Sequence, residues 1–277
     1  MSNRIDTHQH FWKFDPVRDA WIDHTMQVIQ RDFFPEDLSP LLQQNGFEGC
    51  VAVQADQSDS ETEFLLALAD ANDFIKGVVG WTDLKASNLY DKLEVYSQFE
   101  LLKGFRHVAQ GQPEGFLLQP DFVKGVGQLA AFDFTYDILI YANQLNEAFD
   151  FAKKLPNVRF VLDHIAKPSI KDGDLESWSV GIKKLSELPN VSCKVSGMVT
   201  EADWYTWKKS DFQPYLDIVF ESFGIDRIMF GSDWPVCLVA SKYGDMKKIV
   251  TDYISSFSKL EQEKIMGKNA SKFYNLD

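Results

Sequence analysis

A chain of 277 residues is long enough to bury a large core, and 45% hydrophobic with 25% charged residues is an ordinary globular composition. The formal net charge of -13 argues against binding nucleic acid or an anionic membrane, because both attract basic surfaces. Three widely spaced cysteines indicate neither a disulfide framework nor a metal finger.

The chain opens on a predicted strand that carries two histidines, Ile5-Asp6-Thr7-His8-Gln9-His10-Phe11-Trp12. Side chains two positions apart on a strand point to the same face, so His8 and His10 lie side by side. Two imidazoles there can hold a metal ion or polarise a carbonyl oxygen. The next segment, residues 14–34, has no clean period and is predicted to be a long loop.

Beyond that segment, short apolar runs alternate with stretches whose apolar residues recur at helical spacing. The predicted strands are 49–54, 75–81, 102–107, 135–141, 158–164, 191–195 and 227–230. The predicted helices are 36–45, 61–72, 89–99, 121–131, 145–155, 175–188, 212–223 and 245–256.

Eight strand–helix units in one uninterrupted alternation predict a (β/α)8 barrel. An open, doubly wound sheet is the main alternative, but no Gly-rich phosphate loop follows the first strand. We therefore expect one α/β domain over residues 1–277, a single TIM barrel with a short helical tail over residues 260–274.

Active sites of such barrels lie at the C-terminal ends of the strands, and four of the five histidines fall at predicted strand ends. His164 ends the sixth strand, and Asp233 follows the eighth. His164 alone could be a hydrogen-bonded core residue, and Asp233 could cap a turn rich in Gly, Ser and Pro. Together with His8 and His10, they predict a site in which Asp233 acts as a general base.

Other polar residues at strand ends are candidates for binding substrate. Arg106, His107 and Lys194 are donors that could orient substrate oxygens or neutralise a carboxylate. Arg106 could equally pair with an acid inside the barrel. Tryptophan rings near strand ends suit sugar-like rings, although most tryptophans simply pack. The predicted substrate-binding set is Arg106, His107, Lys194, Gln54, Trp12 and Trp81.

These motifs resemble the amidohydrolase superfamily, in the branch that holds the sugar-lactone and pyrone-dicarboxylate lactonases. The likeness covers nearly the whole chain. It rests on residues 6–12, 103–107, 162–168, 194–204 and 230–237. Within it, the run Val199-Thr200-Glu201-Ala202-Asp203-Trp204 is similar to members that act on L-fucono- and related aldonolactones.

The resemblance implies that His8, His10 and His164 bind a divalent metal ion or polarise the lactone carbonyl directly. Asp233 would be a further ligand or the base that activates water. Two-metal members of the superfamily carry a histidine on the fifth strand, whereas residues 135–140 here contain none. We therefore expect one metal ion or none. Zinc suits nitrogen ligands with one carboxylate, and an activated ester such as a lactone could be opened without it.

The expected reaction is hydrolysis of an aldonolactone such as L-fuconolactone to its hydroxy acid, a step of L-fucose degradation. Asp233 would take a proton from water, which attacks the ring carbonyl. A pyrone-dicarboxylate-type lactonase and a metal-dependent decarboxylase of aromatic acids are the alternatives among enzymes. A non-catalytic barrel is the least favoured, since a scaffold has no need of such a constellation.

No leader sequence or membrane-length apolar run is recognisable in the chain. We expect a cytoplasmic protein whose partner is a small-molecule lactone, with neither nucleic acid nor membrane as a partner. A homo-oligomer is compatible with the sequence.

Overall fold

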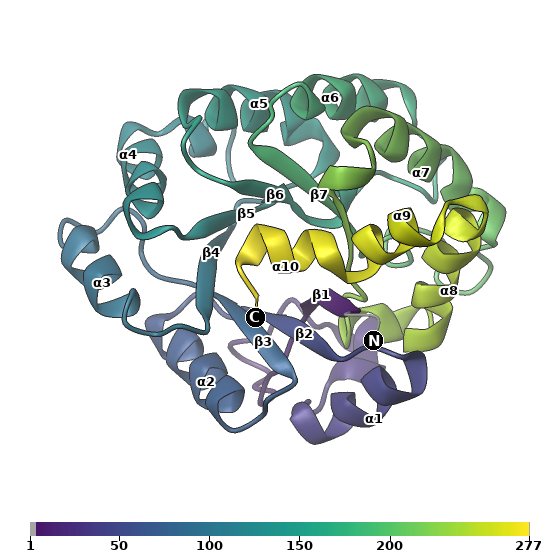
Figure 1. Cartoon of the computed structure of the whole chain (residues 1–277), viewed down its shortest axis with the longest axis horizontal. Helices are drawn as coiled ribbons and strands as arrows, with labels where there is room; N and C mark the ends of the chain where they lie inside the picture. Colours follow the sequence, from purple (N-terminus) through teal and green to yellow (C-terminus); the bar gives the residue numbers. More distant parts are fainter. Residues whose placement is uncertain (1–3, 277) are drawn as a thin grey trace.

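The computed structural model describes residues 4–276, in which eight parallel strands form a ring surrounded by helices (Figure 1). The strands neighbour one another in chain order, from the first to the eighth. They are β1 Ile5–Gln9, β2 Gly49–Val53, β3 Ile75–Gly80, β4 Leu102–Val108, β5 Thr135–Leu139, β6 Phe160–Leu162, β7 Val191–Val195 and β8 Ile228–Phe230. The predicted (β/α)8 barrel is confirmed.

A helix follows each strand and covers the outside of the ring. These helices are α1 Pro35–Asn45, α2 Asp59–Asp70, α3 Leu89–Tyr96, α4 Pro120–Gln128, α5 Leu145–Lys154, α6 Glu176–Ser186, α7 Lys209–Phe223 and α8 Tyr243–Tyr253. In α1, for example, Pro35 occupies the first turn, where its missing N–H costs nothing, and Gly46 ends the helix at a φ of 73°.

Two predictions of local structure differ from what the chain forms. The segment predicted to be a plain loop contains a short 3-10 helix, His24–Ile29. The sixth strand stops at Leu162 rather than His164, because the chain turns there into a left-handed conformation.

The ring closes between β1 and β8 through backbone hydrogen bonds made by residues at or just after the ends of these strands. The N–H of Asp233 donates to the carbonyl of His8 at 2.8 Å, and the N–H of His10 donates to the carbonyl of Trp234 at 2.7 Å. The buried carboxylate of Asp6 accepts from the N–H of Ser232 at 2.8 Å. The seam of the barrel is therefore built from the motifs that carry the predicted site.

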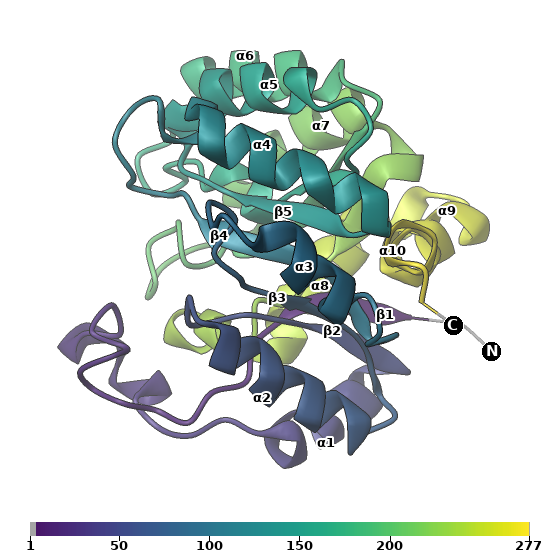
Figure 2. The same cartoon turned by 90° about the vertical axis from the view of Figure 1, so that its left-hand side faces the viewer.

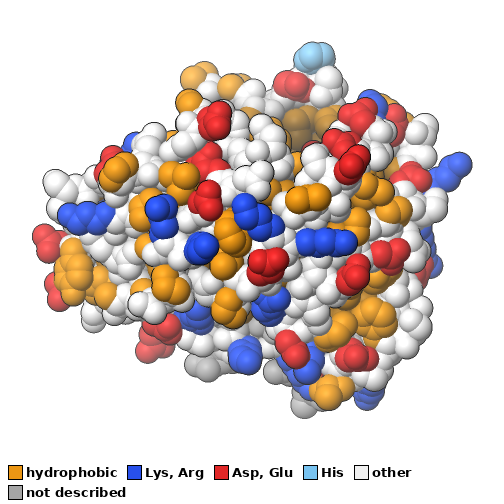
Figure 3. Space-filling view, turned by 90° about the horizontal axis from the view of Figure 1, so that it is seen from above, with side chains coloured by type: hydrophobic (Ala, Val, Ile, Leu, Met, Phe, Trp, Pro, Cys, Tyr) orange, Lys and Arg blue, Asp and Glu red, His pale blue; other side chains and the backbone are white. Residues whose placement is uncertain are grey.

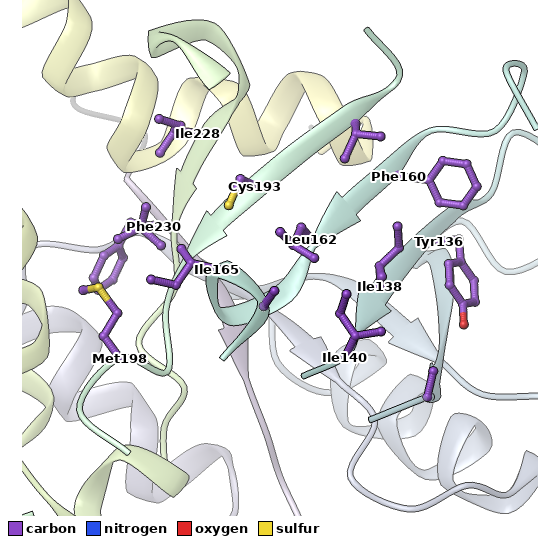
Figure 4. Packing of buried hydrophobic residues seen from close by; sticks show 14 of the residues in the cluster. Tyr136, Ile138, Ile140, Phe160, Leu162, Ile165, Cys193, Met198, Ile228 and Phe230 are labelled. Carbon is purple, nitrogen blue, oxygen red and sulfur yellow. The ribbon is translucent and has the colours of Figure 1, made fainter. Parts of the chain in front are cut away.

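Side chains on the strands alternate between two cores, as expected for parallel strands that are buried on both faces. Figure 4 shows part of the outer core, where Tyr136 and Ile138 of β5 lie beside Phe160 and Leu162 of β6. The inner core fills the barrel itself, and its strand residues are Ile5, Val51, Val53, Val79, Val161 and Met229.

The predicted C-terminal helical tail is present, and it covers the end of the barrel where the strands begin. Figure 2 shows helices α9 (Lys259–Glu263) and α10 (Asn269–Tyr274) at that end, opposite the segment that leads from β1 to α1. Tyr274 enters the barrel and donates its hydroxyl to the Asp137 carboxylate, 3.0 and 2.9 Å from its two oxygens.

The face seen in Figure 3 carries basic and acidic side chains interspersed with hydrophobic ones, without a broad patch of one sign. Among residues 4–276, every helix is too short or too polar to cross a lipid bilayer.

Candidate active site

A cavity of about 310 Å³ lies where the strands end. The predicted site residues that line it are His10, His164, Asp233, Arg106 and Trp12. A wider groove of about 1010 Å³ lies outside the barrel, against α2 and α3, and none of the predicted site residues lines it. The cavity at the strand ends is therefore the candidate active site.

Three imidazoles and one carboxylate converge here: His10, His164 and Asp233 line the cavity, and His8 is fully buried next to them. The Nε2 atoms of His8, His10 and His164 lie 3.9, 3.6 and 3.8 Å from Oδ1 of Asp233. The Nε2 atoms of His8 and His10 are 3.2 Å apart. All four side chains are buried. The structure thus brings together the four residues, at or just after the ends of β1, β6 and β8, that sequence analysis expected to meet.

Each imidazole is oriented by a partner on its other ring nitrogen. Nδ1 of His10 lies 2.7 Å from the carbonyl oxygen of Val53, which can only accept, so Nδ1 carries the proton and Nε2 keeps a lone pair. Nδ1 of His164 lies 2.9 Å from the Ser196 hydroxyl. Around Nδ1 of His8, the nearest groups are Asp163 Oδ1 at 3.3 Å and Lys194 Nζ at 3.2 Å.

The electrostatic surroundings favour neutral imidazoles and an ionised carboxylate. Burial lowers the pKa of His10 below its usual value of 6.5, and lowers the pKa of His8 and of His164 further. Burial alone would raise the pKa of Asp233, but His164, His10 and Lys167 together hold that pKa below 3.8. At neutral pH the site therefore offers three nitrogen lone pairs and one carboxylate.

An unusual backbone conformation aims His164 at the cavity. The four residues from His164 to Lys167 have φ values of 53°, 49°, 62° and 46°, a left-handed run that is unfavourable for L-residues. The run is closed by the N–H of Lys167, which donates to the carbonyl of His164 at 2.8 Å. Gly197 lies directly against the His164 ring, where a Cβ atom would come within 2.5 Å of Nδ1.

Among the described residues, two sets of three ligand atoms lie close enough together to hold a metal ion: His8, His10 and Asp233, and His8, Asp163 and His164, each within 4.8 Å. Ligand atoms about 2.0–2.2 Å from a tetrahedral zinc ion are about 3.4 Å from one another. In the first set, the separations of 3.2 Å between His8 and His10 and of 3.9 and 3.6 Å from these two to Asp233 are close to that spacing. Three neutral nitrogens with one carboxylate oxygen are also the donor set that zinc favours.

Arg106 lies beside these residues and lines the cavity. Its Nη1 is 3.2 Å from Nε2 of His8 and 3.2 Å from Oδ2 of Asp163. Its Nη2 donates to the side-chain oxygen of Gln54 at 3.1 Å. Arg106 therefore pairs with a barrel acid and also lines the cavity, and its role in binding substrate stays a prediction.

Four residues predicted to bind substrate do not line the cavity. Lys194 is fully buried one layer deeper, where it pairs with Asp137 at 2.5 Å and Asp163 at 3.1 Å. Gln54 instead holds Arg106. Trp81 donates its Nε1–H to Nδ1 of His107 at 3.1 Å. His107 in turn stacks on Phe116, with ring centroids 5.1 Å apart.

Several residues at the site were not singled out by sequence analysis. Asp163 stands next to His164 in the motif, and its position beside a site histidine was the available signal. Lys167 lines the cavity as well. From the segment between β1 and α1, Arg18 and Asp19 reach the cavity, although that segment has no periodic pattern to place them. Trp21 of the same segment, one of the tryptophans that the sequence places near strand ends, reaches it too.

The comparisons with known proteins match the whole chain. The model of the family described as "Amidohydrolase" matches residues 5–276. An L-fucono-1,5-lactonase from Burkholderia multivorans is 37% identical over 99% of this chain and 96% of its own length. An L-fucono-1,5-lactonase from Burkholderia ambifaria is 33% identical over 100% of this chain and 97% of its own.

Among solved structures, an amidohydrolase from Burkholderia multivorans with bound Zn is similar to this chain throughout. It is 38% identical, its TM-score is 0.95, and the match covers 99% of each chain.

Proposed function

The chain belongs to the amidohydrolase family, and from this premise we propose that it hydrolyses a sugar lactone, with L-fucono-1,5-lactone as the first candidate. The observation that carries the proposal is the convergence of His8, His10, His164 and Asp233 in a chain that aligns over its full length with two L-fucono-1,5-lactonases. Lactone hydrolysis is favoured over decarboxylation and over a non-catalytic role.

Asp233 is the proposed general base. Its carboxylate stays ionised at neutral pH and lines the cavity, so it can accept a proton from a water molecule there. The water oxygen then attacks the carbonyl carbon of the lactone. The surrounding imidazoles fix the carboxylate in one place, which lowers the entropic cost of bringing base, water and ester together.

Negative charge that develops on the carbonyl oxygen needs donors already in place. Arg106 lines the cavity beside His8 and is the proposed donor from this chain. A divalent metal ion held by His8, His10, His164 and Asp233 would supply Lewis-acid polarisation of the same oxygen. We propose zinc because of the three nitrogen ligands.

The tetrahedral intermediate collapses when the bond from the carbonyl carbon to the ring oxygen breaks. The ring oxygen leaves as an alkoxide and takes the proton that Asp233 had accepted, which regenerates the carboxylate. The product is the open hydroxy acid. For a lactone of L-fuconate, this would place the enzyme in L-fucose degradation. One domain over the whole chain and a cytoplasmic location stay predictions.

A substrate panel tests the proposal. L-fucono-, L-rhamnono-, D-arabinono- and L-galactonolactone are offered with and without a chelator, and acid release is followed with a pH indicator. We expect turnover of at least one aldonolactone and none of aromatic acids such as 2,6-dihydroxybenzoate. CO2 release from an aromatic acid, without lactone hydrolysis, would reject the proposal. The chelator arm reports whether the metal ion is required.

A further inference from the structure

Lys167 is a cavity residue to which the hydrolytic steps assign no role. The left-handed run after β6 has 3-10-like closure, in which side chains three positions apart lie on the same side. His164 and Lys167 therefore face the same space, and both line the cavity. The strained turn that aims the imidazole also aims this ammonium group.

Glu201 fixes the position of that ammonium group. Lys167 Nζ lies 2.9 Å from Oε1 of Glu201, and both side chains are largely enclosed, with 16% and 21% of their surfaces exposed. The loop that carries Glu201 is tied to the turn, because the N–H of Lys171 donates to the Glu201 carbonyl at 2.9 Å. An ammonium group has three N–H donors, so one bond to Glu201 leaves two for a ligand.

The charge balance of the cavity indicates what kind of ligand that is. Among the described residues, the lining cations are Arg18, Arg106 and Lys167. Each is paired with a carboxylate, at 2.8 Å to Asp19, 3.2 Å to Asp163 and 2.9 Å to Glu201 respectively. Asp56 and Asp233 add two further carboxylates to the lining. A substrate carboxylate would therefore meet no uncompensated cation here, whereas hydroxyl oxygens accept from paired cations without a charge of their own.

Two tryptophans in the cavity lining suit the apolar face of a sugar ring. Trp12 and Trp21 both line it, and their rings are perpendicular with centroids 6.0 Å apart. Tryptophan combines a broad apolar surface with a polar edge, which matches the C–H face of a polyhydroxylated ring.

We propose that Lys167, held in place by Glu201, binds a ring hydroxyl of a neutral polyhydroxylated lactone and thereby sets the substrate class. The inference rests on the proposed lactonase function. Lys167 is a substrate-binding residue in this account, and Glu201 is a positioning residue that acts through it.

The experiment compares enzyme variants with substrates that lack one hydroxyl at a time. Wild type, Lys167→Met, Lys167→Arg and Glu201→Gln are assayed on an aldonolactone and on its monodeoxy forms. Lys171→Met is the matched control, because Lys171 belongs to the same loop and pairs with Asp203 at 3.9 Å, but lies outside the cavity lining. Melting temperatures are recorded for every variant.

We expect Lys167→Met to lower kcat/KM on the full aldonolactone about 10- to 100-fold, the range for losing a hydrogen bond from a charged donor, chiefly through KM. For one of the monodeoxy lactones, kcat/KM of wild type should fall by a similar factor relative to the full aldonolactone. For Lys167→Met, kcat/KM on that lactone should equal its value on the full aldonolactone. Glu201→Gln should show the same selectivity more weakly. Lys167→Arg should recover part of the loss, and Lys171→Met should match wild type.

Equal losses on every lactone, or no loss on any, would overturn the role of Lys167 while leaving lactone hydrolysis intact. The arginine and glutamine variants decide the matter if Lys167→Met does not fold. A wild-type preference for 2-pyrone-4,6-dicarboxylate over neutral aldonolactones would overturn the assigned substrate class. A wild type inactive on all lactones would instead reject the proposed function itself.

Discussion

Gly197 lies against the His164 ring so closely that a Cβ atom on it would come within 2.5 Å of Nδ1 and 2.7 Å of Cγ. The ring cannot retreat freely, because its Nδ1 is 2.9 Å from the Ser196 hydroxyl and its backbone is held in the left-handed run. The glycine is thus part of what positions the third imidazole.

Gly197→Ala should therefore push the His164 ring out of place and lower kcat/KM at least tenfold. Gly173→Ala is the matched control, because Gly173 also has a positive φ, 70°, but a Cβ atom there meets nothing within 4 Å. Both variants carry the backbone cost of a non-glycine residue at positive φ. If the two variants lose activity equally, the contact with His164 does not matter.

The hydroxyl of Tyr274 ties the C-terminal tail to the charged cluster inside the barrel. Tyr274→Phe removes the donor to Asp137 and leaves a buried carboxylate with one partner fewer. We expect a loss of about 1–3 kcal/mol in the free energy of unfolding, measured with urea. Tyr205→Phe, at a side chain that is 86% exposed, should change it by less than about 0.5 kcal/mol. Equal values for the two variants would contradict this role of the tail.

Lys194 balances two buried carboxylates, Asp137 and Asp163, and does not reach the cavity. Lys194→Met should destabilise the fold by about 3–5 kcal/mol, because it leaves uncompensated charge in the barrel. Adding Asp137→Asn removes part of that charge and should restore part of the stability. If Lys194→Met alone folds normally but binds substrate poorly, the result would instead support the direct contact between Lys194 and substrate that the sequence suggested. Urea unfolding and KM measured together separate the two outcomes.

His107 predicts a specific pH dependence of stability. Burial, helped by nearby Lys85, lowers its pKa from 6.5 to about 4. The unfolded chain therefore takes up this proton first as the pH falls, and the folded state loses stability between about pH 6.5 and 4. In His107→Phe this contribution is absent. The unfolding free energy of the variant minus that of wild type should therefore increase by about 2 kcal/mol when the pH is lowered from 7 to 5. A difference that stays constant with pH would contradict the prediction.

The sequence was sufficient to predict the barrel and the meeting of His8, His10, His164 and Asp233, because both depend on strong local signals. Strands buried on both faces are continuous apolar runs, and alternation with helices leaves few topologies. His8 and His10 share a strand face at spacing two, and His164 and Asp233 follow strands whose C-terminal ends meet at one edge.

The sequence did not predict how deep along the barrel axis each strand-end side chain lies. Lys194 and Arg106 are both cations near a strand end, yet Arg106 lines the cavity and Lys194 is buried among carboxylates in a deeper layer. The left-handed run that aims Lys167 has no glycine to mark it. Arg18, Asp19 and Trp21 come from a segment held by tertiary contacts, where no periodic pattern exists to predict an orientation.

The most direct test of the central claim is kcat/KM of Asp233→Asn on L-fucono-1,5-lactone. Asparagine keeps the shape of the side chain but cannot accept the proton of the attacking water. The account predicts a fall of about 10²- to 10⁴-fold with an unchanged melting temperature, while Asp226→Asn, at an exposed ion pair with Lys264, keeps wild-type activity. Activity of Asp233→Asn within threefold of wild type would contradict the account.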